Sequence, residues 1–368
     1  MPFNYKTKPY EHQEEALLRS FNRKNYAYFM EMGCGKSKVL IDNITWLYEE
    51  QKIDTAIIIA PKGVYMNWKN AEIPIHLPDN IEKNVYIWKA SANKTEKKVL
   101  EEGVKTRDKL RILLVNVESF ATAKVIKYLE AFTHRSNFML AVDESTTIKN
   151  IKAKRTKSVL KLGDSAQYKR ILTGSPITQS PMDLYAQCAF LDKDLLGFDS
   201  YWSFQGRYAI VRQTRMGNHS FQQVVGFRNL EELTDKLHNF AYRVTKKEAL
   251  DLPDKIYTTR EVVLTSDQIK HYNSMKDVAV AFLEGGDMVT APEVMTRLLR
   301  LQQLLCGYLV TDDGETVEIA NHRIDAMLDT IAEMDGKVII WSRFRHDIKK
   351  IGTRLLIGSK MIRRQDSL

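Results

Sequence analysis

The chain has 368 residues, of which 44% are hydrophobic and 27% charged, a composition typical of a globular protein and not of a disordered one. Its net charge of +9 favours a polyanionic partner. No apolar run approaches the ~20 residues of a membrane span, the N-terminus lacks the apolar core of a secretory signal, and the three cysteines have no metal-ligand spacing. We therefore expect a soluble, intracellular, cytoplasmic protein.

The first segment with a possible ligand role is residues 8–13, which precede an amphipathic helix expected over residues 14–21. Gln13 could read the edge of an adenine, because its amide offers one acceptor and one donor. An exposed glutamine before a helix usually has no such role, so both readings stay open here.

Residues 29–38, FMEMGCGKSK, have the form of a phosphate-binding loop that opens a helix. Gly33 and Gly35, on either side of Cys34, would let backbone N–H groups close around phosphate oxygens. Lys36 could then reach the β- and γ-phosphates, and the Ser37 hydroxyl could ligate Mg²⁺. Only the second half of the full motif is present, and an ordinary glycine turn is the alternative.

The flanks of this loop fit the motif, with a buried strand expected over residues 26–30 and a helix over 39–48. A central parallel strand is predicted at residues 55–60, TAIIIA, because the run is continuously apolar and β-branched. Ligands of open α/β sheets bind at the carboxyl ends of such strands. Lys62 and Trp68 follow that end and could contact a nucleic-acid backbone, although Trp68 could equally be a core residue.

Three further strands are predicted downstream, over residues 111–115, 137–142 and 168–172. Asp143 and Glu144 directly follow the second of these. Downstream of a phosphate loop, the first carboxylate of such a pair holds Mg²⁺ and the second orients and deprotonates a water. The alternative for the pair is a helix N-cap.

The last of these strands is followed by Thr173, Gly174 and Ser175. Their small polar groups could hydrogen-bond the acidic pair and a neighbouring segment, and so couple the nucleotide state to a partner. A plain turn is the alternative.

Taken together, these motifs resemble the first lobe of a Swi/Snf-type ATPase of helicase superfamily two. The resemblance is carried by short segments spread over nearly the whole chain: PYxxQ at 9–13, EMGxGKS at 31–37, IAPK at 59–62 through Trp68, DE at 143–144 with IKN at 148–150, TGSPI at 173–177, and KVIIWSR at 337–343. It implies an α/β fold, a RecA-like parallel sheet flanked by helices, followed by a truncated second RecA-like lobe.

The resemblance also implies roles for individual residues. Tyr10 and Gln13 would bind adenine, residues 33–37 the phosphates, Ser37 and Asp143 the Mg²⁺, and Lys36, Asp143 and Glu144 would be catalytic. Thr173, Gly174 and Ser175 would couple the ATP site to DNA. Contacts to the backbone of double-stranded DNA would come from Lys62, Trp68, Lys149 and Asn150.

The sequence departs from the family pattern at several positions. Thr146 replaces the usual histidine of the acidic motif, and no segment matches the motif whose arginines reach the γ-phosphate in the family. We therefore expect lobe one over residues 1–255, with a helical and loop-rich extension at about 192–250, and an incomplete lobe two over 257–368. In lobe two we predict a helix at 291–307, a strand at 337–343 and a further strand beginning at 355–358.

The predicted function is that of a DNA-dependent, helicase-like motor that uses ATP and Mg²⁺, of the translocase or remodeller type, and weakly active alone. A separate chain could supply the rest of lobe two. Two alternatives remain: a non-catalytic, ATP-gated DNA-binding module, and an unrelated P-loop nucleotide enzyme such as a kinase.

Overall fold

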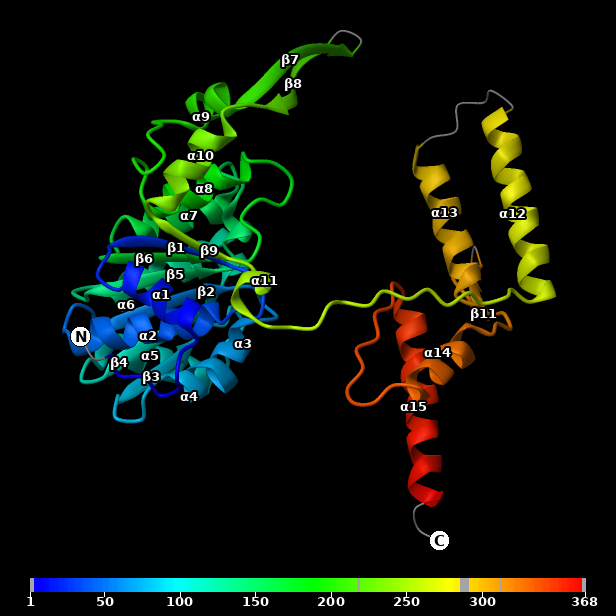
Figure 1. Cartoon of the computed structure of the whole chain (residues 1–368), viewed down its shortest axis with the longest axis horizontal. Helices are drawn as coiled ribbons and strands as arrows, with labels where there is room; N and C mark the ends of the chain where they lie inside the picture. Colours follow the sequence, from blue (N-terminus) through cyan, green and yellow to red (C-terminus); the bar gives the residue numbers. More distant parts are fainter. Residues whose placement is uncertain (1–2, 217–218, 285–290, 312, 366–368) are drawn as a thin grey trace. The chain divides into compact units, whose positions relative to one another are not determined.

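The computed structural model describes residues 3–216, 219–284, 291–311 and 313–365. The chain divides into two compact units, unit 1 over Met1–Asp254 and unit 2 over Lys255–Leu368 (Figure 1).

Unit 1 is built on a seven-stranded, fully parallel sheet with the order β3-β4-β2-β5-β6-β1-β9. The strands are β1 (Asn25–Met30), β2 (Thr55–Ala60), β3 (Lys83–Ile87), β4 (Leu110–Asn116), β5 (Phe138–Asp143), β6 (Tyr168–Leu172) and β9 (Ala241–Val244). The five predicted strands are all present, within two residues at each end. Four of them could be predicted because their runs are apolar at nearly every position, as strands buried on both faces require, whereas β6 also contains Lys169 and Arg170.

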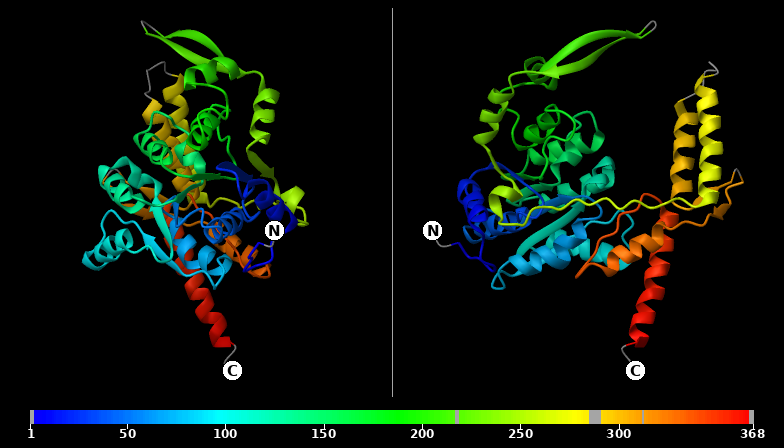
Figure 2. Two further views of the ribbon diagram at one scale, coloured as in Figure 1. Left: turned by 90° about the vertical axis from the view of Figure 1, so that its left-hand side faces the viewer. Right: turned by 45° about the vertical axis from the view of Figure 1, so that its right-hand side comes forward.

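Helices cover both faces of this sheet (Figure 2). Side chains alternate between two cores: Ala27 and Phe29 of β1 point into one, and Tyr28 and Met30 into the other. The first core is closed by α5 (Lys94–Lys105), α6 (Ala123–Thr133), α7 (Lys154–Gly163), α8 (Asp183–Leu191), α9 (Tyr201–Tyr208) and α10 (Leu230–His238). The second is closed by α1 (Glu11–Ser20), α2 (Lys36–Glu49) and the segment formed by α3 (Tyr65–Asn67), a π-helical turn η1 (Trp68–Glu72) and α4 (Ile73–His76). Short 3₁₀ turns η2 (Val117–Ala121) and η3 (Ser145–Ile148) and the helix α11 (Lys246–Ala249) complete the unit. The predicted α/β fold is confirmed.

The sequence missed two strands and a hairpin in unit 1. Strand β3 lies in a lysine-rich segment, and edge strand β9 has only four residues, so neither shows a long apolar run. The extension expected to be helical and loop-rich also contains an antiparallel hairpin of β7 (Ala209–Met216) and β8 (His219–Phe227). Its side chains are mostly exposed, which removes the apolar alternation that would have marked a half-buried strand.

Residues 145–170 contain eight lysines and arginines and one carboxylate, and part of this basic segment is structural. Arg170 is fully buried, and its guanidinium donates to the Asn43 side chain and to backbone carbonyls that include those of Ser20 and Arg23. A buried cation with this many acceptors ties β6 to α1 and α2 and is not available to a polyanion.

Unit 2 contains helices and a small antiparallel sheet. Its elements are α12 (Ser266–Glu284), α13 (Ala291–Leu305), β10 (Tyr308–Val310), β11 (Thr316–Glu318), α14 (Arg323–Ala332) and α15 (Arg345–Gln365). The helix predicted at 291–307 is confirmed. The strand predicted to begin at 355–358 is wrong, because these residues continue helix α15.

The strand predicted at 337–343 is also wrong. These residues have no regular secondary structure and no strand partner, and Trp341 is 90% exposed. A strand needs a neighbour to satisfy its backbone, and the described part of unit 2 places no strand beside this segment. Among the described residues, no helix is both long and apolar enough to cross a bilayer.

Candidate functional site

The segments singled out in the sequence of unit 1 meet at one edge of the sheet. Strands β2, β5, β6 and β1 are consecutive in the sheet and parallel, so their carboxyl ends lie next to one another. The loops that follow them contain, in that order, Lys62, the Asp143–Glu144 pair, Thr173–Ser175 and the loop at 31–35. This edge is where open α/β sheets bind ligands.

The loop between β1 and α2 has the backbone that a phosphate cradle requires. Gly33 and Gly35 have φ of +87° and +82°, in the left-handed region that favours glycine. Gly35 is the N-cap of α2, so Lys36 and Ser37 form the first turn of a 14-residue helix. The Lys36 ammonium donates to the Met30 carbonyl at 2.9 Å, which holds it inside the loop.

Helix α1 packs directly against this loop. The Gln13 amide nitrogen donates to the Cys34 carbonyl at 3.2 Å, the His12 ring lies 2.9 Å from the same oxygen, and Gln13 Oε1 accepts from the Tyr10 N–H. A Cβ at Gly35 would lie 2.2 Å from Gln13 Nε2, so a larger residue would push this side chain away from the loop, and the positive φ at Gly35 favours glycine in any case. Cys34 itself is buried, and burial raises the pKa of its thiol.

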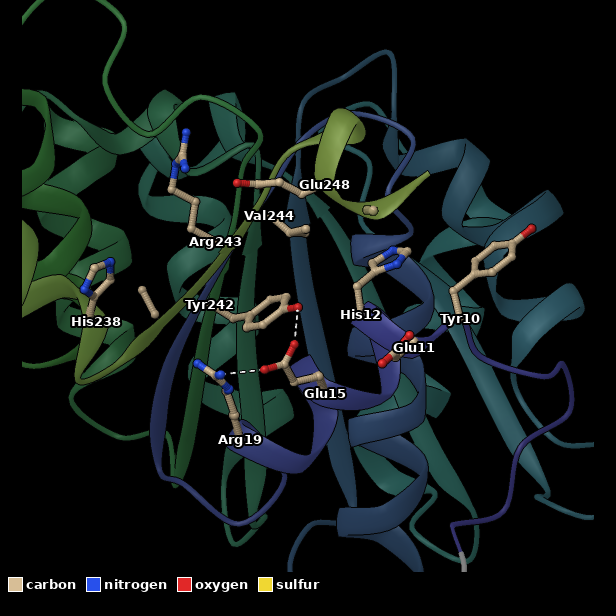
Figure 3. A pocket seen from close by; sticks show the side chains of 12 residues that line it. Tyr10, Glu11, His12, Glu15, Arg19, His238, Tyr242, Arg243, Val244 and Glu248 are labelled. Carbon is tan, nitrogen blue, oxygen red and sulfur yellow. Dashed lines mark hydrogen bonds and ion pairs between the residues drawn. The ribbon is translucent and has the colours of Figure 1, made fainter. Parts of the chain in front are cut away.

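A cavity of about 930 Å³ opens beside this contact, between α1 and the segment β9–α11 (Figure 3). Tyr10 and His12 line it with their rings nearly parallel, and the Tyr10 ring is 63% exposed. Across the cavity, the Tyr242 hydroxyl of β9 donates to Glu15 of α1, which also pairs with Arg19. An exposed aromatic ring above a polar wall could stack on a planar base.

Asp143, at the end of β5, is held from two sides. Its Oδ2 accepts from the Trp68 indole N–H at 2.9 Å, and its Oδ1 accepts from the Glu144 N–H at 3.0 Å. Burial raises the pKa of Asp143 to about 6; the Trp68 hydrogen bond and the Lys36 charge oppose this rise, and the Glu144 carboxylate adds to it.

Glu144 adopts a conformation that is unusual for a residue with a side chain. Its φ and ψ are +50° and 60°, in the left-handed region, at the start of the 3₁₀ turn η3. Such strain costs about 1–3 kcal/mol and is concentrated at functional sites. The Glu144 carboxylate accepts from the Thr173 hydroxyl at 3.3 Å, which fixes its direction.

The 173–175 segment also touches the phosphate loop. A Cβ at Gly174 would lie 3.1 Å from the Met32 backbone nitrogen, so the two backbones are in close contact. Thr173 and Gly174 therefore connect Glu144 to Met32 through direct contacts. The three predicted segments are therefore in contact with one another.

Gln187 of α8 joins the same site and could not be singled out from sequence. Its Oε1 accepts from Ser145, next to the acidic pair, and its Nε2 donates to the Pro176 carbonyl, next to Ser175. This amide ties the two motifs on the side where Thr146 replaces the family histidine. Glu31, whose carboxylate accepts from the Lys246 N–H at 2.8 Å, similarly ties the phosphate loop to α11.

Of the residues predicted to contact DNA, only two are exposed. Lys62 and Asn150 are open to solvent on loops at this edge. Trp68 is 1% exposed, so a direct DNA contact by Trp68 is wrong for this conformation and the core alternative is correct. Lys149 lies 3.3 Å from the Asp183 carboxylate and also donates to Thr178, so its charge is already paired.

The oxygen donors of the site suit a hard divalent cation. Mg²⁺ prefers carboxylate, hydroxyl, phosphate and water oxygens. Asp143 offers a carboxylate oriented by two donors, and Ser37 offers a hydroxyl on the first turn of α2. These residues fit a magnesium ion that is completed by phosphates and water.

Comparison with known proteins gives consistent results. A family model described as "SNF2-related domain" matches residues 18–308. The human "Helicase-like transcription factor" is 26% identical over 276 residues, which are 72% of this chain and 25% of that protein. In Schizosaccharomyces pombe, "SWI/SNF chromatin-remodeling complex subunit snf22" is 28% identical over 81% of this chain and 17% of its own length.

The chain spans about a quarter of the length of the human relative. A phage protein, "Putative protein p41" of Acyrthosiphon pisum secondary endosymbiont phage 1, is 23% identical over 94% of this chain and 73% of its own length. Among solved structures, the "SWI2/SNF2 ATPase core in complex with dsDNA" of Sulfolobus solfataricus covers 95% of this chain and 70% of its own, with a TM-score of 0.53 and 24% identity. That similarity supports the fold.

Proposed function

The chain belongs to the SNF2-related domain family of ATPases, and from this premise we propose that it hydrolyses Mg²⁺-ATP in response to double-stranded DNA. The observation that carries the proposal is the contact series from the phosphate loop through Gly174 and Thr173 to Glu144. It brings a phosphate-binding backbone, a lysine and a candidate base for water to one edge of the sheet.

Each residue has a role that its position supports. The backbone of 33–35 and the Lys36 ammonium would bind the phosphates, at the positive end of α2. Ser37 and Asp143 would hold Mg²⁺, which would neutralise phosphate charge when bound. Glu144, held by Thr173, would orient and deprotonate the attacking water.

The base of the nucleotide would lie against Tyr10, at the cavity beside α1. Gln13 now donates to the Cys34 carbonyl, and its role would be to read adenine or to hold the loop that binds the phosphates. Thr173, Gly174 and Ser175 would pass the state of the nucleotide to a DNA contact.

We propose that the DNA contacts are made to the duplex backbone and are largely independent of sequence. Lys62 and Asn150, both exposed, are the candidates. The related core from Sulfolobus was solved with double-stranded DNA, and family resemblance favours translocation or remodelling over strand separation.

Residues 1–255 would form the ATP-binding lobe, and residues 257–368 part of a second lobe. In the family, arginines of the second lobe stabilise the transition state and are worth roughly 10³–10⁵ in rate. The described part of unit 2 has only the two-stranded β10–β11 sheet and leaves 337–343 unpaired. We therefore expect slow turnover by this chain alone, and a separate chain could complete the lobe.

The test is the steady-state ATPase rate of the full chain with and without duplex DNA. We expect DNA to raise the rate, and Lys36→Ala and Glu144→Gln to abolish the rise. Lys97→Ala, an exposed lysine on α5, is the matched control and should behave as the unmodified chain. An ATPase rate that changes neither on addition of DNA nor in the Glu144→Gln variant would refute the proposal.

A second candidate, an ATP-gated DNA-binding module without catalysis, is favoured by the incomplete sheet of unit 2. It predicts DNA affinity that responds to ATP while phosphate release stays at background. An unrelated P-loop enzyme would show turnover on which DNA has no effect.

A further inference from the structure

The β7–β8 hairpin of unit 1 is a surface that the ATP site does not use. It is a separate two-stranded sheet, inserted between α9 and α10, and it projects away from the central sheet beyond these helices (Figures 1 and 2). Its side chains from Val211 to Gln213 and from Gln222 to Val225 are exposed. A ribbon held away from the core in this way has two faces available to a partner.

The charged side chains of the hairpin segment itself are all basic. Residues 200–230 contain four arginines and no carboxylate. Two of these arginines are structural: Arg207 pairs with Glu232 of α10, and Arg228 donates to the carbonyls of Arg207 and Gly206. They fix the base of the hairpin and are not available for binding.

The other two arginines lie along the ribbon itself. Arg212 and Arg215 are exposed, and neither has a hydrogen bond or ion pair among the residues that the structure describes. Successive side chains of a strand point to opposite faces, so Arg212 and Arg215, three positions apart, lie on opposite faces of the ribbon. Free guanidinium groups without any neighbouring carboxylate are complementary to a polyanion.

The neighbours of these arginines are neutral hydrogen-bonding side chains. Arg212 lies opposite Gln223, and Gln213 lies opposite Gln222, in the antiparallel register. Arginine and glutamine are the side chains that pair with phosphates and with guanine and adenine edges. The exposed apolar residues, such as Ile210 and Val225, lie at the base, beside the β-bulge between Ile210 and Val211.

We propose that the β7–β8 hairpin is a second contact with duplex DNA. A two-stranded ribbon fits the major groove, and the two faces of the ribbon would then direct Arg212 toward one flanking phosphate backbone and Arg215 toward the other. This inference rests on the proposed function, because it names a further surface for the same partner. It places a DNA contact on a segment between α9 and α10, outside the loops at the sheet edge.

The test is the binding of a fluorescently labelled 30-base-pair duplex to the full chain, measured by anisotropy over a series of salt concentrations. The variant is Arg212→Gln with Arg215→Gln, which removes two charges and keeps side chains suited to a strand. The matched control is Lys97→Gln with Lys98→Gln, an equal charge loss at exposed positions of α5. Thermal melting of each variant checks that the fold is retained.

We expect the hairpin variant to bind the duplex roughly three- to thirtyfold more weakly. The slope of log K against log salt should fall by about 0.9 for each lost phosphate contact, or about 1.8 for two. ATPase activity without DNA should be unchanged. The control should change both binding quantities much less.

Two results would overturn the inference, and they are distinguishable. If the unmodified chain binds the duplex and the hairpin variant matches the control, the hairpin is not a DNA contact and the proposed function stands. If the unmodified chain does not bind duplex DNA at all, the proposed partner fails and the hairpin contact fails with it.

Discussion

The hydrogen bond from Trp68 to Asp143 gives a sharp prediction. Trp68→Phe keeps an aromatic ring in the core but removes the indole N–H that fixes Asp143 Oδ2 at 2.9 Å. Among the residues that the structure describes, the Glu144 N–H would then be the one hydrogen-bond donor left on this carboxylate. Because Asp143 is a proposed ligand of Mg²⁺, its orientation should matter for metal binding.

The size of the effect follows from two terms. Loss of a hydrogen bond to a buried charged group costs about 1.5–3 kcal/mol, and the smaller ring adds a cavity term of about 1 kcal/mol. Unit 1 should therefore melt roughly 5–15 °C lower, at about 2–4 °C per kcal/mol. Loss of a partner that orients a metal ligand typically lowers metal affinity about 10–100-fold.

The assay is ATPase rate as a function of Mg²⁺ at fixed ATP, in the presence of duplex DNA. We expect Trp68→Phe to need at least about tenfold more Mg²⁺ for half-maximal rate. Trp202→Phe is the matched control, because Trp202 is 60% exposed and makes no contact with the acidic pair. An unchanged Mg²⁺ requirement in a folded Trp68→Phe chain would refute the reasoning.

Three further predictions concern packing and burial. Gly35→Ala should lower the free energy of unfolding by about 1–3 kcal/mol and abolish ATP binding, because the added Cβ meets both a positive φ and the Gln13 amide. Adding Gln13→Ala should recover part of this stability in a denaturant titration, and no recovery would contradict the clash. Gly174→Ala should weaken ATP binding and lower the free energy of unfolding by about 1–3 kcal/mol, because the new Cβ would press on the Met32 backbone nitrogen. An ATP affinity that calorimetry finds unchanged would contradict the importance of this contact. Burial raises the pKa of the Cys188 thiol to about 12. Because the folded chain favours the protonated thiol, the stability that Cys188 contributes is present at neutral pH and is lost as the pH rises toward 12. At pH 8, iodoacetamide should leave Cys188 unlabelled until the chain is unfolded, and rapid labelling of the folded chain, followed by mass spectrometry, would show otherwise.

The fold of unit 1 could be predicted where burial leaves a clear pattern. Residues 56–60 are apolar at every position because β2 is covered on both faces, and the strand predicted at 55–60 has the bounds that the structure shows. Strand β9 could not be found, because four residues at a sheet edge carry little signal. The strand predicted at residues 337–343 was wrong for the opposite reason. Their apolar pattern is strong, but a strand also needs a neighbouring strand, which a sequence pattern does not reveal.

The site was predictable as a set of motifs and not as a set of contacts. Motif order could suggest that Asp143, Glu144 and Thr173 act together, and the parallel sheet brings them to one edge. The Trp68 indole on Asp143 and the Gln187 bridge depend on side-chain direction after folding. The π-helical turn that begins at Trp68 turns this residue inward, and no spacing rule indicates such a turn.

The most direct test of the central claim is single-turnover phosphate release by Glu144→Gln, measured with Mg²⁺-ATP and duplex DNA beside the unmodified chain. Removal of a general base typically costs about 10²–10⁴ in rate. We predict that the variant binds ATP as tightly as the unmodified chain and releases phosphate at least about a hundredfold more slowly. Phosphate release at an unchanged rate would contradict the assignment of Glu144 and the site built around it.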